Sequence, residues 1–315
     1  MYYLFGIFIA LIISLLILDL TVFHKKAHAD NVKQALAWTA FWVALALLFN
    51  VGVYFLYQYD VLKISSSIGS NIDGKTAAIT FLTGYLIEES LSLDNVFVMA
   101  LIFDYFHIPQ ERQHRVLFWG ILGAIVFRGV MIVAGIGIIR AFSWSIYIFG
   151  AILIISAVKM LFSQHDDLKL EKNFVVRFAK RFWTVEQDNH SNKFFVKRNG
   201  KTVVTTLFLA LLTVETTDIV FAVDSIPAIF AVTNDPFIIF TSNIFAILGL
   251  RSLYFALAAM LNKFRYLKLS LVCMLAYVGV KMIIAHHFPI PTWVTLVVIV
   301  SFLSIGMLAS LINKK

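Results

Sequence analysis

The sequence lacks most of what a disulfide-stabilised or thiol-ligated protein would need. Its 315 residues include a single cysteine, Cys273, which excludes an intrachain disulfide and a thiolate metal cluster. Charge is also scarce, since charged residues make up 14% of the chain and hydrophobic residues 60%. The apolar runs are about 19 to 25 residues long, which is the length that crosses a bilayer. The sequence therefore predicts an all-α, polytopic membrane protein.

Nine transmembrane spans are expected from these apolar runs. No basic residues precede the first span and no small-residue cleavage site follows it, so we expect it to be retained in the membrane. The spans cover residues 2–23, 34–57, 77–103, 115–139, 144–162, 203–232, 237–261, 267–285 and 291–312.

The distribution of basic residues predicts the orientation of the spans. If the N-terminus lies outside, the outer loops contain only Lys63, Lys75 and Arg140, and the other loop lysines and arginines are cytoplasmic. This pattern satisfies the positive-inside rule and predicts an outer N-terminus and an inner C-terminus. The net charge of +8 then reflects topology and attraction to anionic lipid headgroups, and we do not expect nucleic acid as a partner.

The chain is expected to contain two copies of a three-span unit, residues 76–163 and 202–288. Aligning Asp94 with Asp224 superimposes LSLDN on FAVDS. Three further pairs of charged residues then coincide, namely Glu88 with Asp218, Arg128 with Arg251 and Lys159 with Lys281. Because each copy has an odd number of spans, the second copy would enter the membrane from the opposite side. Such inverted repeats are typical of secondary transporters.

The remaining segments are expected to support the two copies. Residues 1–75 would form two bracing spans, and residues 289–315 would form the last span. Residues 164–201 would form a cytoplasmic connector. Within it, KNFVVRFAKRFW fits a helix on the membrane surface, and FFVKRNGKTVV fits a small hairpin with an Asn-Gly turn.

Acidic residues inside the predicted spans are the strongest functional signal. Each would cost about 2.5 to 3.5 kcal/mol if it faced lipid, so they are expected to face protein, water or an ion. Asp19 alone is read as a structural group near the inner end of the first span. The other six lie in the first span of each copy, and they are Glu88, Glu89, Asp94, Glu215, Asp218 and Asp224.

Helical spacing predicts how these acids are presented. On an ideal helix Glu88, Ser92 and Asn95 share one face, and Glu215, Asp218 and Ser225 share another. Asp94 and Asp224 point away from those faces. Pro227 is expected to break its helix and to turn Asp224 inward, because proline cannot donate to the carbonyl of Val223.

The candidate ligands are all oxygen donors. Mg²⁺, Ca²⁺ and Mn²⁺ prefer such ligands, whereas Zn²⁺, Cu and Ni²⁺ usually recruit histidine or cysteine, which are not near these acids in sequence. The pattern therefore predicts a divalent cation without choosing among the three. The predicted metal ligands are Glu88, Asp94, Asn95, Glu215, Asp218, Asp224 and Ser225, with Ser92 and Asn243 as further oxygen donors.

Structural ion pairing is the alternative interpretation of these acids. Arg128 and Arg251 lie near the middle of their spans, where they are expected to neutralise an acid or hold it in place. Lys159 and Lys281 lie toward span ends and are expected to reach the membrane surface. His286 and His287, a conceivable metal pair, are read as the end of an interfacial loop.

Five stretches resemble the TerC family of integral membrane proteins, especially its Alx-like bacterial branch. They are FLTGYLIEESLSLDNVF (81–97), IYIFGAIL (146–153), KFFVKRNGK (193–201), VFAVDSIPAIFAVTNDPFI (220–238) and TSNIFAILGLRSLYF (241–255). The resemblance implies export of Mn²⁺ across the bacterial cytoplasmic membrane by a protein that is not an enzyme and has no resident cofactor. It carries the family's acids onto Glu88, Asp94, Glu215, Asp218 and Asp224. Glu89 departs from this branch, which tends to have lysine after the first acid.

We therefore expect a Mn²⁺ exporter in which Glu88, Asp94, Asp218 and Asp224 form a near-symmetric carboxylate cage that exchanges metal for protons. Two alternatives remain open. One is a Ca²⁺ or broader divalent cation/proton exchanger that uses the same ligands. The other is a membrane scaffold or assembly factor that depends on residues 164–201 and transports nothing. The sequence does not predict the oligomeric state.

Overall fold

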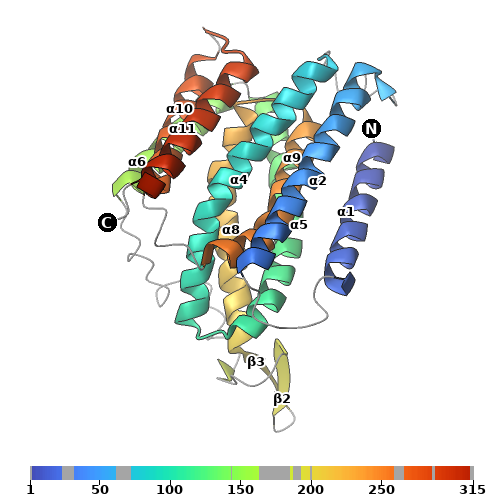
Figure 1. Ribbon diagram of the computed structural model, residues 1–315, viewed down its shortest axis with the longest axis vertical. Coiled ribbons are helices and arrows are strands. Elements are labelled where there is room, and N and C mark those ends of the chain that lie inside the picture. Colours follow the sequence, from blue (N-terminus) through green and yellow to red (C-terminus); the bar gives the residue numbers. More distant parts are fainter. Residues whose placement is uncertain are drawn as a thin grey trace.

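The computed structural model describes residues 2–22, 32–61, 72–142, 144–162, 185–186, 193–198, 201–258, 266–285 and 288–312. Within these residues the chain forms a bundle of nine helices with a small sheet at one end (Figure 1). The helices are α1 (Tyr2–Val22), α2 (Val32–Gln58), α4 (Gly74–Tyr105), α5 (Gln110–Ala141), α6 (Ser145–Phe162), α8 (Thr206–Phe230), α9 (Pro236–Ala258), α10 (Leu267–Ile284) and α11 (Thr292–Ile312).

The helices fall where the apolar runs of the sequence predict them, which confirms the all-α membrane architecture. By length and composition α2, α5, α6, α8, α9 and α11 can each cross a membrane. Helix α1 has a shorter apolar stretch, Tyr3–Leu18. Many large apolar side chains of the outer helices are exposed, for example Val133 at 73% and Leu48 at 67%. This is the surface expected of helices that face lipid tails.

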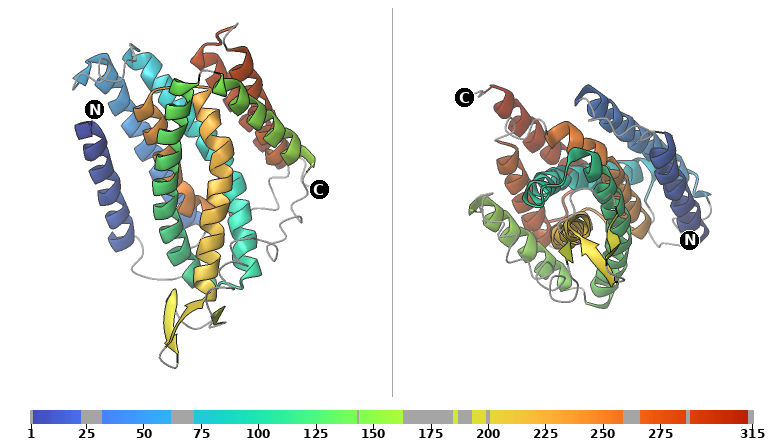
Figure 2. Two further views of the ribbon diagram at one scale, coloured as in Figure 1. Left: turned by 180° about the vertical axis from the view of Figure 1, so that it is seen from behind. Right: turned by 90° about the horizontal axis from the view of Figure 1, so that it is seen from below.

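Helices α4 and α8 lie side by side at the centre of the bundle (Figure 2). They run in opposite directions, since α4 ends and α8 begins at the end of the bundle that carries the sheet (Figure 1). Around them, α4 packs on α9, α5 packs on α8, and α6 packs on α10. Helix α9 is almost completely buried, whereas α1 lies at the margin of the bundle. Helix α8 keeps one side on the surface, where Val220 is 61% exposed, while Asp218 and Ser225 are buried on its other side.

The sheet confirms the hairpin expected from the Asn-Gly sequence. Strands β2 (Phe195–Arg198) and β3 (Lys201–Thr205) pair antiparallel, and β1 (Val185–Glu186) pairs parallel with the other edge of β3. Strand β3 leads directly into α8. The surface helix expected over residues 172–183 and the pair His286 and His287 lie outside the described residues.

The helix break expected at Pro227 is wrong. Helix α8 continues through this proline to Phe230. The proline removes one backbone hydrogen bond, but the last turn that follows it packs tightly, with Ala228 and Ile229 fully buried. Burial of the final turn therefore maintains the helix, and Asp224 keeps the direction that an unbroken helix gives it.

Candidate functional site

Arg128 of α5 lies at the centre of a buried polar network. Its guanidinium donates to both carboxylate oxygens of Asp218, from Nη2 to Oδ1 at 2.8 Å and from Nε to Oδ2 at 3.2 Å. Nη1 forms an ion pair with Glu88 Oε1. Arg128 and Glu88 are fully buried and Asp218 is 5% exposed. The arginine thus joins acids from α4 and α8, the first helices of the two predicted copies.

Two neutral side chains complete the network. Ser225 Oγ accepts from Arg128 Nη1 at 3.3 Å, and Asn243 Oδ1 accepts from the same nitrogen at 3.4 Å. Asn243 Nδ2 donates to Glu88 Oε2 at 2.8 Å, which fixes the orientation of its amide. Glu88, Asp218, Ser225 and Asn243 therefore direct oxygen atoms at one guanidinium, and two carboxylates face one positive charge.

Glu88 and Asp218 therefore form ion pairs with Arg128. Structural ion pairing was the alternative interpretation that the sequence left open for these acids. Sequence reasoning grouped Glu88 with Asp218 through the repeat alignment, and it placed Arg128 near an acid. It named Asn243 only as a further oxygen donor, although a fully buried asparagine needs polar partners. An amide in the middle of an apolar span is the signal that identifies this residue.

Glu215 lies one turn before Asp218 on α8 and is packed against Gly123 of α5. A Cβ atom on Gly123 would overlap with the Glu215 carboxylate, so only glycine leaves room for it there. Glu215 Oε2 is buried and has no hydrogen-bond partner among the described residues. Buried polar atoms without protein partners call for water or an ion. Glu215 therefore presents an unsatisfied acceptor beside the network.

Helix α4 presents three further buried acceptors without protein partners in the described part of the chain. They are Glu89 Oε2, Ser92 Oγ and Asn95 Oδ1. Ser92 is fully buried and Asn95 is 3% exposed. Glu89 interacts with Tyr85, one turn earlier on the same helix. The candidate ligand Asn95 and the neighbouring Glu89 therefore each present a buried oxygen without a protein partner in the described part of the chain.

Asp224 and Asp94 lie apart from the Arg128 network. Asp224 Oδ1 accepts a hydrogen bond from Ser156 of α6 at 2.6 Å, and Lys159 of the same helix also acts on it electrostatically. Asp94 is half-buried on α4. Among the described residues, no three or more His, Cys, Asp or Glu side chains form a ready-made metal site. The four-acid cage stays a prediction.

The two remaining cations of the repeat alignment are both buried. Arg251 is 4% exposed and Lys281 is 5% exposed. The expectation that Lys281 reaches the membrane surface is therefore wrong. Gly279 and Ile283 of α10 face α6, whereas Lys281 lies on the side of α10 that carries Ser270 and packs on α11, so α11 and not α6 covers it.

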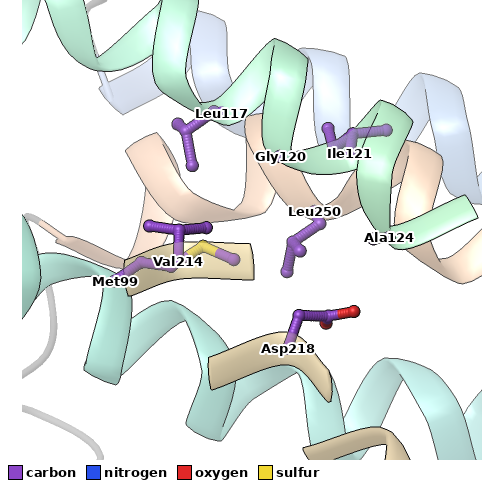
Figure 3. Close-up of a pocket in the computed structure, with 8 residues that line it drawn as sticks. All are labelled: Met99, Leu117, Gly120, Ile121, Ala124, Val214, Asp218 and Leu250. Atoms are coloured by element: carbon purple, nitrogen blue, oxygen red, sulfur yellow. The ribbon is translucent and has the colours of Figure 1, made fainter. Parts of the chain in front are cut away.

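A small, largely enclosed pocket lies beside Asp218, between the network and the sheet end of the bundle. Asp218 is the one charged residue among those that line it, and the Met99 side chain points into the same space (Figure 3). The pocket lies between α4, α5, α8 and α9. Its other lining residues are Leu117, Gly120, Ile121, Ala124, Val214 and Leu250.

Comparison with known proteins agrees with the membrane architecture. An uncharacterised membrane protein of Myxococcus xanthus is 47% identical over 98% of this chain and 92% of its own length. A membrane protein of Rickettsia bellii is 44% identical over 98% of this chain and 97% of its own. A protein of Photorhabdus laumondii, named as a candidate membrane-bound redox modulator, Alx, is 43% identical over 99% and 95%. No solved structure matches.

The family comparison covers the part of the chain that carries the network. The model described as "Integral membrane protein TerC family" matches residues 73–315, which include every helix from α4 to α11. The chain therefore belongs to the TerC family of integral membrane proteins.

Proposed function

We propose that this protein is a secondary transporter that exports Mn²⁺ from the cytoplasm through the acid-rich centre of its bundle. The observation that carries the proposal is the convergence of oxygen atoms from Glu88, Asp218, Ser225 and Asn243 at one buried point. Carboxylate, hydroxyl and amide oxygens are the ligands that Mn²⁺, Mg²⁺ and Ca²⁺ prefer. Mn²⁺ is proposed because of the family to which the chain belongs.

The excess of acid at this point supports a cation as the transported species. Arg128 is one positive charge, and it faces Glu88 and Asp218. The carboxyl group of Glu215 interacts electrostatically with that of Asp218, and the carboxyl group of Glu89 interacts with that of Glu88. An anion carrier would instead need cations in excess at its site. Exchange against protons would let the carboxylates that Arg128 does not neutralise stay protonated when no metal is bound.

The helix packing supports an inverted repeat of α4–α6 and α8–α10. If a twofold axis in the membrane plane relates the copies, the contact of α4 with α9 must have a counterpart between α8 and α5. Both contacts exist, and α6 packs on α10 as the third helix of each copy. The opposite directions of α4 and α8 agree with this symmetry (Figure 1). Rocking of one copy against the other would then alternate access.

The acids are also spread along the membrane normal. At a rise of about 1.5 Å per residue, the spacing of six positions from Glu88 to Asp94 places Asp94 about 9 Å nearer the sheet end. The same spacing on the antiparallel α8 places Asp224 about 9 Å farther from that end than Asp218. We propose that the ion binds transiently at Asp94 and at Asp224, which lie on the two sides of the Arg128 network. The sheet end of the bundle would then face the cytoplasm.

The name redox modulator, given to relatives, does not require thiol chemistry in this chain. A dithiol relay needs two cysteines, and the sequence has only Cys273. Export of a redox-active metal ion is one way in which such a protein would influence redox state indirectly.

The test is metal content in bacterial cells that lack or express the protein, measured for Mn, Ca and Mg together. Expression should lower cellular Mn and raise tolerance to added Mn²⁺. Glu88→Gln and Asp218→Asn should abolish this effect, whereas Asp104→Asn, on the exposed end of α4, should retain it. Unchanged Mn with lowered Ca would favour the broader exchanger. Full activity of both site variants would favour the scaffold alternative.

A further inference from the structure

The Arg128 side chain occupies the position where a divalent cation would bind. Its guanidinium nitrogens contact Glu88 Oε1, both carboxylate oxygens of Asp218, Ser225 Oγ and Asn243 Oδ1. These five oxygen atoms come from α4, α8 and α9 and surround one positive centre. Their number and type match the incomplete shell of a hard divalent cation that keeps some of its water.

We propose that Arg128 is a tethered competitor for the transported ion, which fills the central site when the ion is absent and must withdraw when the ion binds. This inference rests on the proposed function, because it concerns the same site. It adds that the empty carrier is held in a defined state by its own arginine. It therefore assigns Arg128 a role in setting affinity and in the return of the empty carrier.

Simultaneous occupancy is opposed by both space and charge. Arg128 donates to both oxygens of Asp218, at 2.8 Å and 3.2 Å, so its guanidinium lies where a metal ion bound by both oxygens would sit. A divalent ion placed between Glu88 and Asp218 would also lie against the guanidinium in a buried, weakly screened environment. Binding of the ion therefore requires the arginine to move.

The same burial explains why a competitor is needed. Glu88 and Asp218 are 0% and 5% exposed, so two ionised carboxylates would face each other without a counter-charge in the empty carrier. Removing one partner from a buried ion pair is strongly destabilising, because it leaves uncompensated charge. Arg128 supplies the counter-charge between transport events.

The pocket gives the direction from which the ion would meet the arginine in this conformation. It lies against Asp218 on the side of the network nearer the sheet end of the bundle, and its other lining residues are uncharged (Figure 3). An ion that approaches from this side first reaches the carboxylate that Arg128 holds with two bonds. Displacement of the arginine would thus begin at Asp218.

The experiment uses the full-length protein reconstituted in lipid vesicles, with Mn²⁺ influx followed by a metal-quenched dye. Arg128→Gln removes the competing charge and should lower the KM for Mn²⁺ by about tenfold, since the competent site is no longer masked. Net transport should slow, because the empty site lacks its counter-ion on the return step. Exchange of Mn²⁺ for Mn²⁺ across the membrane should persist, because it does not require the empty carrier to return.

Three comparisons separate this role from a purely structural one. Arg128→Lys keeps the charge without the bidentate geometry, and its KM should lie between those of the wild type and Arg128→Gln. Arg140→Gln makes the same change at an exposed position of the same helix, α5, and should leave KM unchanged. Mn²⁺ should raise the melting temperature of Arg128→Gln more than that of the wild type, because the ion replaces the missing counter-charge.

An unchanged KM in both Arg128 variants, with exchange and net transport reduced equally, would overturn the proposal while leaving Mn²⁺ transport intact. Loss of transport in the wild-type vesicles is a different result, because it would remove the proposed function as well. If the Arg128 variants are too unstable for reconstitution in vesicles, the increase in melting temperature that Mn²⁺ causes in detergent still tests the proposal. Absence of any extra stabilisation by Mn²⁺ would count against the arginine as a stand-in for the ion.

Discussion

Gly150 of α6 and Gly279 of α10 face each other backbone to backbone. The carbonyl oxygen of each glycine lies 3.0 Å from the position that a Cβ atom on the other would occupy. The contact is reciprocal, so the two helix backbones approach each other closely at this point. Small residues at such crossings let helices approach closely in membranes, where apolar burial contributes little to association.

Gly279→Ala should therefore separate α6 from α10. The new methyl group would meet Ile154 at 2.9 Å, Leu153 at 3.1 Å and the Gly150 carbonyl, and backbone cannot move aside cheaply. We expect a loss of about 1 to 3 kcal/mol, the usual cost of overpacking, seen as a lower melting temperature in detergent. Gly52→Ala on α2, where nothing lies within 4 Å, is the control and should not lower it.

Tyr57→Phe should loosen the attachment of α2 to the start of α9. Tyr57 donates to Asp235 Oδ2 at 2.8 Å, while Oδ1 of the same carboxylate accepts from the backbone N–H groups of Phe237 and Ile238. Loss of a hydrogen bond to a charged group costs about 1.5 to 3 kcal/mol. Melting temperature is the readout, and Tyr54→Phe, at a more exposed position of α2, should leave it unchanged. Equal effects of the two substitutions would contradict this assignment.

Sequence reasoning predicted the helices well because their apolar runs are long. It grouped Glu88 with Asp218 because the alignment of the two predicted copies places these acids opposite each other. It failed at Pro227, where burial of the final turn outweighs the local propensity for a break. It also did not foresee the contact of Gly123 with Glu215. Which helix faces another at a given residue depends on packing in three dimensions, and periodicity within one helix does not contain that information.

Asp224 and Ser156 offer a test of the transient binding site proposed on the outer side of the network. Asp224→Asn should reduce Mn²⁺ transport severely, because the amide lacks the charge that would receive the ion. Ser156→Ala removes only the hydrogen bond of 2.6 Å that orients the carboxylate, so its effect on transport should be smaller. Vesicle transport rates for the two variants provide the comparison. A larger loss from Ser156→Ala than from Asp224→Asn would refute the carboxylate's role.

Asp73 caps the N-terminus of α4 and should give the protein a pH-dependent contribution to stability. Its carboxylate accepts from the Thr76 N–H at 3.2 Å, and hydrogen bonding to Thr76 lowers the pKa of Asp73 below its usual 3.8. Because the folded-state pKa is the lower one, the contribution is present above pH 3.8 and is lost as the pH falls through the folded-state value.

The check compares melting temperatures of the wild type and Asp73→Ala from pH 3 to pH 7. The difference between them should be constant near neutral pH and should shrink below about pH 4. Asp73→Asn keeps a capping oxygen that does not titrate, so its difference from Asp73→Ala should not vary with pH in this way. A difference that grows on acidification would contradict the lowered pKa.

Gly123 and Gly137 provide a matched pair on α5 for testing the place of Glu215. Gly123→Ala would drive a methyl group into the Glu215 carboxylate, which would have to leave its position beside Asp218. We expect Mn²⁺ transport to fall by at least an order of magnitude, as small displacements of site groups commonly cause. Gly137→Ala has nothing within 4 Å and should keep transport, with α5 stabilised by up to about 1 kcal/mol through helix propensity. Rates in vesicles, normalised to folded protein, distinguish the two variants. If Gly123→Ala transports at the wild-type rate, the carboxylate of Glu215 has no part in the ion's path.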